Sequence, residues 1–259
     1  MQLSFSKYHG TGNDFIIIDN RAETFPKETR LIKHLCDRHF GIGADGLMLL
    51  EPSGDANFYM RYFNADGNES TMCGNGGRSI TLFARELGLI KSSAHFMGID
   101  GEHYAKIDAN NIIDLKMQDV NSIDVGKNYY FINTGSPHYV CFVDDVQKID
   151  VIITGRAIRN NFNLNNGGTN VNFVDFSNEM INIRTYERGV ESETLACGTG
   201  SVASAIAYCC HSKIYKSEYK IQTLGGELKV KFERLNDFEY KNIWLKGPAV
   251  HVFDGQIII

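Results

Sequence analysis

The 259-residue sequence lacks the features of a membrane-bound or exported protein. It has no run of about 18 consecutive apolar residues, whereas a transmembrane helix needs roughly 20. The first residues, MQLSFSKYHGTGNDF, contain no apolar core of a secretory signal. We therefore expect a cytoplasmic protein without membrane contact.

The chain also lacks a concentration of charge. It has 26 basic and 31 acidic residues, a net charge of −5, and no run of Lys or Arg. Nucleic-acid-binding surfaces cluster cations on one face, so we expect no nucleic-acid partner. A small anionic substrate responds to its local site rather than to net charge, and the composition does not argue against one.

Cysteine is sparse, which excludes two common uses of it. The six cysteines are too few for a disulfide scaffold, and no Cys-x-x-Cys pair occurs. We therefore expect reduced thiols and neither a thioredoxin-type motif nor a cysteine zinc site. The cysteines are Cys36, Cys73, Cys141, Cys197, Cys209 and Cys210.

Nucleotide-binding motifs are absent or misplaced. The chain has no GK[ST] of a P-loop. GIGADG at 41–46 matches the G-x-G-x-x-G pattern of dinucleotide-binding loops, but the helix and strand predicted on either side of it stand in the opposite order. Residues 30–40 predict a helix before it and residues 47–51 a strand after it, whereas that loop follows a strand and opens a helix. GTGSVA at 198–203 precedes a helix but lacks the acidic partner, so we expect no nucleotide cofactor.

One pattern is present twice. STMCGNGGRS at 70–79 and TLACGTGSVAS at 194–204 both contain Cys-Gly-x-Gly, each with a glutamate four residues before the cysteine. The alternating segments FYMRYFNADGNES and INIRTYERGVESE precede them and predict strands. The second copy has one more residue between its arginine and its cysteine.

Each motif leads into a predicted helix and a further strand. Apolar residues recur at i, i+3, i+4 and i+7 from Ile80 and from Val202, which indicates amphipathic helices, and Gly88 predicts the end of the first. GEHYAKI from Gly101 and GELKVKF from Gly226 alternate as strands do. Chance similarity of two β-turn-α units is the alternative, but the matched spacings favour two similar α/β lobes. A polar stretch at 117–128 predicts their boundary near residue 119.

A cysteine at the start of a helix can act as a proton carrier. Unpaired N–H groups and the positive end of the helix dipole favour the thiolate, and neighbouring glycines let a carboxylate approach the backbone. Inversion of a stereocentre needs a base on one face and an acid on the other. We therefore expect Cys73 and Cys197, titrating as a coupled pair, to invert an amino acid.

Four segments resemble the diaminopimelate epimerase family: HGTGNDF, FNADGNESTMCGNGGRS, GSPHYV and ERGVESETLACGTG. The similarity runs from residue 7 to the C-terminal GPAVHVFDG. It implies a cofactor-independent isomerase that interconverts LL- and meso-diaminopimelate, in lysine and peptidoglycan precursor synthesis. It also implies a homodimer.

The fold implied is α/β (α+β), with two pseudo-symmetric lobes. Each lobe would be a curved, mostly antiparallel sheet wrapped on a central helix, with the active site in the cleft between them. Residues 1–118 would carry Cys73, with the tail 250–259 packed on them, and residues 119–249 would carry Cys197.

The resemblance also implies roles for individual residues. Cys73 and Cys197 would exchange protons with the substrate, and His138 and Glu187 would tune their ionisation. Arg188 could bind the distal carboxylate with two N–H groups. The substrate-binding residues would be Asn13, Asn64, Gly74, Asn75, Asn170, Glu187, Arg188, Gly198 and Thr199. No cofactor and no metal are implied.

Three positions depart from the family pattern. Some members have glutamine at Gly46, asparagine at Ser136 and frequently glycine at Ser192. Structural alternatives also exist for the site residues. Cys73 could be a core cysteine and His138 a turn residue, while the asparagines could shape turns and the Glu187–Arg188 pair could lie in solvent.

Three other functions stay open on the sequence. The protein could be a two-thiol racemase of proline or histidine, a thiol-redox protein with a Cys73–Cys197 disulfide, or a non-catalytic carboxylate-binding protein. Arg188, Asn64 and Asn170 favour a substrate with a second polar end, and therefore diaminopimelate.

Overall fold

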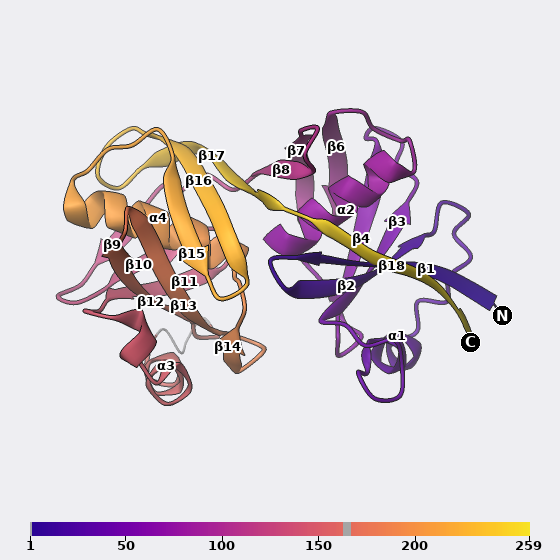
Figure 1. Ribbon diagram of the computed structural model, residues 1–259, viewed down its shortest axis with the longest axis horizontal. Coiled ribbons are helices and arrows are strands. Elements are labelled where there is room, and N and C mark those ends of the chain that lie inside the picture. Colours follow the sequence, from indigo (N-terminus) through magenta and orange to yellow (C-terminus); the bar gives the residue numbers. More distant parts are fainter. Residues whose placement is uncertain (1, 163–166) are drawn as a thin grey trace. The chain divides into compact units, whose positions relative to one another are not determined.

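The computed structural model describes residues 2–162 and 167–259 (Figure 1). The chain forms two compact units. The first comprises Met1–Leu115 together with Gly247–Ile259, and the second comprises Lys116–Lys246. The first unit is therefore built from two separate parts of the chain.

The first unit contains two α-helices and a sheet that includes the C-terminal strand. The helices are α1 (Thr29–Cys36) and α2 (Gly74–Glu86). The strands are β1 (Gln2–Gly10), β2 (Asn13–Asp19), β3 (Gly46–Glu51), β4 (Phe58–Asn64), β5 (Glu69–Ser70), β6 (Ser93–Gly98), β7 (Gly101–Ile107), β8 (Ile112–Lys116) and β18 (Val250–Ile258).

The second unit repeats this pattern. Its helices are α3 (Val151–Arg159) and α4 (Gly198–Ser212), with a short 3₁₀ helix η1 (Val146–Lys148). The strands are β9 (Ile123–Val125), β10 (Tyr130–Asn133), β11 (Pro137–Phe142), β12 (Asn170–Ser177), β13 (Met180–Glu187), β14 (Ser192–Thr194), β15 (Tyr219–Thr223), β16 (Gly226–Arg234) and β17 (Tyr240–Pro248).

The strand pairings show that both units share one topology. In the first unit, β2 pairs parallel with β3 and β4 parallel with β6, while the other neighbours from β18 to β8 pair antiparallel. In the second, β11–β12 and β13–β15 are the parallel pairs, and the rest are antiparallel. Each parallel pair is joined by a segment containing a helix, as parallel strands require. The prediction of a mixed fold with mostly antiparallel sheets is confirmed.

The helices after the two cysteines lie inside their units (Figure 1). Every residue of α2 from Gly74 to Ala84 is buried, and in α4 every residue from Gly198 to Cys210 is buried except Thr199. The two predicted helices are confirmed, but the exposed polar face expected of an amphipathic helix is not found over these residues. An amphipathic helix has one apolar face and one wet face, whereas the sheets leave almost no wet face here. Small residues supply the helix surface that lets strands approach from several sides.

The other two helices cover the sheets from outside. Ile32 and Leu35 of α1 join an apolar cluster that includes Ile16 and Leu47 of the neighbouring strands. In the second unit, α3 lies so close to β13 that a Cβ on Gly155 would lie 2.4 Å from the Cβ of Tyr186. No helix in the described part of the chain has the length and apolar character needed to cross a bilayer.

Candidate active site

Cys73 is the residue immediately before helix α2. Its backbone is extended (φ −94°, ψ 134°), and Gly74 is the first residue of the helix. The first backbone N–H groups of a helix have no partner within it and carry partial positive charge. The N-terminal end of α2 therefore lies next to Cys73, and the prediction that this cysteine starts a helix is confirmed.

Cys197 occupies the equivalent position before helix α4. Its Sγ accepts a hydrogen bond from the backbone N–H of Gly200 at 3.4 Å, so the sulfur itself caps the helix. Cys197 is 7% exposed. A sulfur held by an N–H donor at the positive end of a helix favours the thiolate over the thiol.

Asparagine amides orient the surroundings of Cys73. The Oδ1 of Asn13 lies 3.6 Å from Cys73 Sγ and accepts a hydrogen bond from Asn75 Nδ2 at 3.2 Å. Asn13 Nδ2 donates to Asp45 Oδ2 at 2.7 Å, which fixes the direction of the Asn13 amide. The structure thus brings Asn13, Gly74 and Asn75 together with Cys73.

A buried arginine under this site is missing from the residues predicted from the sequence. Arg78 is fully buried, and its Nη2 donates to Asn75 Oδ1 at 2.7 Å while its Nη1 donates to Gly74 O at 3.2 Å. Burial lowers the pKa of Arg78 to about 10, so the guanidinium keeps its positive charge at neutral pH. In the sequence, Arg78 is visible as the arginine that ends CGNGGR. Helix periodicity alone does not predict that this arginine is buried.

A chain of hydrogen bonds reaches Cys197 from His138. His138 Nε2 lies 2.9 Å from Thr199 Oγ1, which in turn lies 3.5 Å from Cys197 Sγ. On the other side of the imidazole, Asn172 Nδ2 lies 3.1 Å from Nδ1, and Asn172 Oδ1 accepts from Thr185 Oγ1 at 3.0 Å. The amide of Asn172 therefore donates to Nδ1, which assigns the ring proton to Nε2.

The ring of His138 is neutral at neutral pH. Burial, with the nearby charge of Arg188, lowers the pKa of His138 to about 3. The Nε2–H donates to Thr199, whose own hydroxyl hydrogen can then point at Cys197. A path of hydrogen-bond distances therefore connects the ring of His138 to Cys197 Sγ through Thr199.

Three further predicted residues, Asn170, Glu187 and Arg188, make hydrogen bonds around the turn after β13. The backbone N–H of Arg188 donates to Asn170 Oδ1 at 2.9 Å, and Asn170 Nδ2 donates to Pro137 O at 3.0 Å. Glu187 Oε2 accepts from Thr194 Oγ1 at 2.8 Å. The amide of Asn170 therefore joins the turn that carries Arg188 to the first residue of β11.

Asn64 lies in the first unit, at the exposed end of β4. Its backbone N–H donates to Asn68 O at 3.0 Å, and its own carbonyl accepts from Gly67 N at 2.9 Å. These bonds close the turn between β4 and β5, which leads to Cys73.

The structure shows the local setting of the three positions that depart from the family pattern. A Cβ on Gly46 would lie 2.6 Å from Phe63 O, so no side chain fits without a shift. Ser136 Oγ lies 3.1 Å from His138 Nε2 and 3.2 Å from Thr199 Oγ1, and thus takes part in the chain to Cys197. Ser192 is an ordinary strand residue opposite Glu187.

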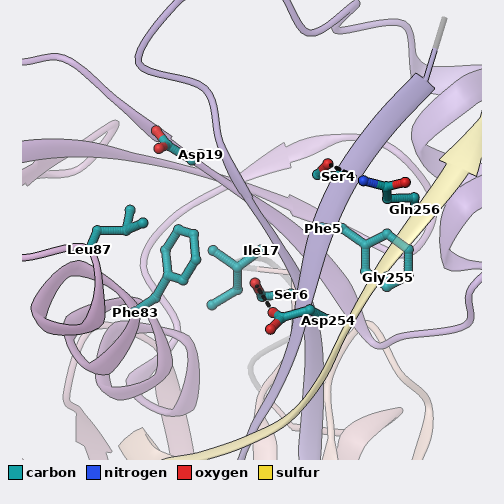
Figure 2. Close-up of a pocket in the computed structure, with 10 residues that line it drawn as sticks. All are labelled: Ser4, Phe5, Ser6, Ile17, Asp19, Phe83, Leu87, Asp254, Gly255 and Gln256. Atoms are coloured by element: carbon teal, nitrogen blue, oxygen red, sulfur yellow. Dashed lines mark hydrogen bonds between the residues drawn. The ribbon is translucent and has the colours of Figure 1, made fainter.

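One cavity in the first unit is separate from Cys73. It has a volume of about 480 Å³ and is lined by residues of β1, β2, β18 and the C-terminal part of α2, including Phe83 and Leu87 (Figure 2). Phe83 lies ten residues after Cys73, roughly 15 Å along the helix at about 1.5 Å per residue. This cavity does not belong to the thiol site.

Comparison with known proteins gives a consistent family. A family model described as "Diaminopimelate epimerase" matches residues 5–120 and 130–252. The chain is 51% identical over 257 residues to the diaminopimelate epimerase of Flavobacterium psychrophilum, covering 98% of this chain and 100% of the relative. It is 40% identical over 259 residues to that of Chlorobaculum tepidum, covering 96% and 99%.

Solved structures show the same fold at low identity. A phenazine biosynthesis protein of the PhzF family from Bacillus anthracis has a TM-score of 0.77 at 16% identity and covers 100% of both chains. A probable proline racemase from Agrobacterium radiobacter has a TM-score of 0.76 at 16% identity, covering 99% of this chain and 93% of its own. These two likenesses concern the fold alone.

Proposed function

Because the chain belongs to the diaminopimelate epimerase family, we propose that it interconverts LL- and meso-diaminopimelate without a cofactor. One cysteine thiolate removes the α-proton, and the thiol of the other cysteine returns a proton to the opposite face. The roles of Cys73 and Cys197 are exchanged after each turnover. The reaction supplies meso-diaminopimelate to lysine and peptidoglycan precursor synthesis.

The observation that carries this proposal is the paired placement of the two cysteines. Each is the residue before a buried helix, in Cys-Gly-x-Gly, within one of two units that share a topology. The α-proton of an amino acid is a very weak acid, so the carbanion needs electrostatic stabilisation. Helix N-termini aimed at the substrate carboxylate stabilise the charge that develops there, and a dry site strengthens that effect.

Residue roles follow from the same proposal. Gly74, Asn75, Gly198 and Thr199 donate to the reacting carboxylate, and Thr199 also donates to the Cys197 thiolate. Arg188 binds the distal carboxylate with two N–H groups. Glu187 and His138 influence the ionisation of the thiols, His138 through Thr199. The other substrate-binding residues in this proposal are Asn13, Asn64, Asn170 and Glu187.

We also propose the molecular context of the reaction. The proposed lobes are residues 1–118, with 250–259, and residues 119–249, each supplying one cysteine; each bound lies three residues from that of the corresponding compact unit. The chemistry needs reduced thiols, which the cytoplasm maintains, so the enzyme works there. It forms a homodimer, as the family resemblance implies.

A deuterium experiment tests the proposal directly. The protein is incubated with LL-diaminopimelate in D₂O under reducing conditions, and both deuterium at the α-carbon and meso product are measured. We expect both. Neither label nor inversion, with reduced thiols verified, would refute the epimerase function. Parallel assays with proline and histidine test the rival racemase functions, and we expect no inversion of either.

A further inference from the structure

An arginine–glutamate pair precedes each cysteine in the structure. Arg61 Nη1 lies 2.7 Å from Glu69 Oε1 in the first unit. In the second, Arg184 donates to both carboxylate oxygens of Glu193, from Nε at 2.6 Å and from Nη2 at 2.7 Å. The two glutamates stand four residues before Cys73 and Cys197. The same pair of side chains therefore occurs twice, with the glutamate at the same distance along the chain from a thiol and the arginine one residue farther away in the second copy.

The two pairs also share one strand register. Glu69 lies opposite Phe63, and Glu193 lies opposite Tyr186. Each arginine is two residues before that partner on the longer strand, so the side chains meet diagonally on one face of the sheet, where long side chains are within reach. Shared spacing and shared register make a chance arrangement a poor explanation.

The glutamates stand on very short strands, which have few backbone hydrogen bonds to fix their position. Strand β5 has two residues and β14 has three, and each ends three residues before its cysteine. Most strands in proteins are longer and carry more ladder hydrogen bonds. The arginine pairs add charge-assisted hydrogen bonds at these positions, directly before the residues that orient each thiol.

The two arginines differ in their other contacts. Arg61 Nε lies 2.9 Å from Glu51 Oε2, so its charge is shared with a second carboxylate. Arg184 Nη1 instead donates to the carbonyls of Val146 at 3.0 Å and Ile149 at 2.9 Å. Loss of Glu193 removes the only carboxylate that the structure pairs with Arg184 among the described residues, whereas loss of Glu69 leaves Arg61 paired.

We propose that Arg61–Glu69 and Arg184–Glu193 are matched positioning pairs, each of which fixes the chain segment that aims one catalytic cysteine. This inference rests on the proposed two-cysteine reaction. Neither pair touches the reacting atoms. Each acts through the three residues that follow its glutamate. The Cys197 side depends more strongly on its pair than the Cys73 side does.

Three variants of the full-length protein test this inference. Glu69→Gln and Glu193→Gln each remove one carboxylate charge. The control is Glu218→Gln, which removes a carboxylate paired with Lys229 at 3.0 Å and Lys231 at 3.3 Å, away from both cysteine segments in sequence. For each variant, kcat, KM and Tm are measured, and the iodoacetamide alkylation rates of Cys73 and Cys197 are followed separately by peptide mass spectrometry under reducing conditions.

We expect a local effect on each thiol. In Glu69→Gln the alkylation rate of Cys73 changes at least threefold, while that of Cys197 stays within 1.5-fold of wild type. In Glu193→Gln the alkylation rate of Cys197 changes at least threefold, while that of Cys73 stays within 1.5-fold. We expect kcat to fall at least tenfold in Glu193→Gln and less in Glu69→Gln, with KM within twofold. Glu69→Asp and Glu193→Asp restore part of kcat because they keep the charge. If a Gln variant fails to fold, kcat and the alkylation rates are measured on the Asp variant in its place.

Two results would overturn the inference. One is wild-type kcat and wild-type alkylation rates in both Gln variants. The other is an equal change at both cysteines in each variant, which would indicate general loosening of the fold. Alkylation requires no substrate, so it separates this inference from the proposed function. If the wild-type protein fails to epimerise diaminopimelate, the alkylation pattern still tests the positioning role.

Discussion

The thiol of Cys197 is surrounded by neutral donors in the second unit. Thr199 receives the Nε2–H of His138, which leaves the threonine hydroxyl hydrogen available for the sulfur. A protonated histidine at this place would add charge to a buried site, and burial opposes that. In the proposed reaction, a thiolate at Cys197 would be stabilised by hydrogen bonds from Gly200 and Thr199, without a buried imidazolium.

Cys73 and Cys197 should both be essential for inversion if they are the proposed pair of proton carriers. In Cys73→Ala or Cys197→Ala only one proton carrier remains, so we expect inversion of LL-diaminopimelate to fall at least about 1,000-fold, the order that loss of an essential catalytic group produces. Product chirality measured by chiral chromatography checks this. Cys36→Ala is the control, because Cys36 lies in the apolar core of α1. Inversion at the wild-type rate in either active-site variant would contradict the two-base reaction.

Thr199→Val should slow the reaction because it removes the hydroxyl that faces Cys197. A hydrogen bond to a charged group contributes about 1.5–3 kcal/mol, so we expect kcat to fall about 10- to 100-fold. The pH-rate limb that depends on the thiolate should also move to higher pH. Thr199→Ser keeps the hydroxyl and should keep most of the activity. Equal loss in the Val and Ser variants would argue against this role.

His138 should make the protein less stable in acid. The folded-state pKa is about 3, below the ordinary 6.5, so at intermediate pH the unfolded chain binds a proton that the folded chain does not. The contribution is complete above pH 6.5 and is lost as pH falls toward 3. Between pH 7 and pH 5 we expect wild type to lose about 2 kcal/mol more than His138→Asn.

Urea unfolding at these two pH values measures this difference. His39→Asn is the control, since His39 is exposed. A pH dependence in His138→Asn equal to that of wild type would mean that His138 takes up its proton in the folded protein at ordinary pH.

Local patterns in the sequence predicted the thiols but not the groups that support them. Cys73 and Cys197 could be found because the glycines and helix starts recur in adjacent residues. Asn172 could not, because it meets His138 through the parallel register of β11 and β12, in which His138 pairs with Asn170. Arg78 was missed because arginine is almost never fully buried. Its side chain is held by hydrogen bonds to Asn75 Oδ1 and to the backbone carbonyl of Pro248, a residue near the C-terminal end of the chain.

At the level of elements, the apolar periodicity of the sequence was a misleading guide to how deeply the central helices are buried. The spacing from Val202 predicted one apolar face, yet almost all of α4 is buried. Small residues such as alanine, serine and glycine can pack against strands on several sides of the helix. A periodicity analysis that considers only large apolar residues does not predict their burial. The strands were easier to predict: the segments from Gly101 and Gly226 form β7 and β16 as expected.

The third residue of each central helix should respond differently to alanine. A Cβ on Gly200 would lie 2.5 Å from Asn172 Oδ1, whereas on Gly76 it would lie 3.2 Å from the flexible sulfur of Met48. Alanine favours a helix by up to about 1 kcal/mol over glycine, but a forced contact costs about 1–3 kcal/mol. We therefore expect Gly200→Ala to lower the free energy of unfolding and Gly76→Ala to change it little. Urea unfolding compares them, and equal effects would contradict the packing argument.

At the level of the whole molecule, the two units differ in chain continuity. The second unit is a single segment, Lys116–Lys246, whereas the first needs Gly247–Ile259 in addition to its N-terminal part. Strand β18 pairs with β1 from Gln2–Ile258 to His9–Val250. Pro248 O also accepts a hydrogen bond from the buried Arg78 at 3.2 Å. The end of the chain therefore supports the helix start that carries Cys73.

Fragments of the chain should differ in stability for this reason. We expect residues 116–246 to unfold cooperatively on heating, as a unit with its own core does. Residues 1–115 alone should not, because β1 then exposes an unpaired edge and Arg78 loses an acceptor. Joining 247–259 to residues 1–115 through a flexible linker should restore cooperative unfolding. Circular dichroism with calorimetry checks all three fragments. Cooperative unfolding of residues 1–115 without the C-terminal strand would show that the core around α2 is sufficient by itself.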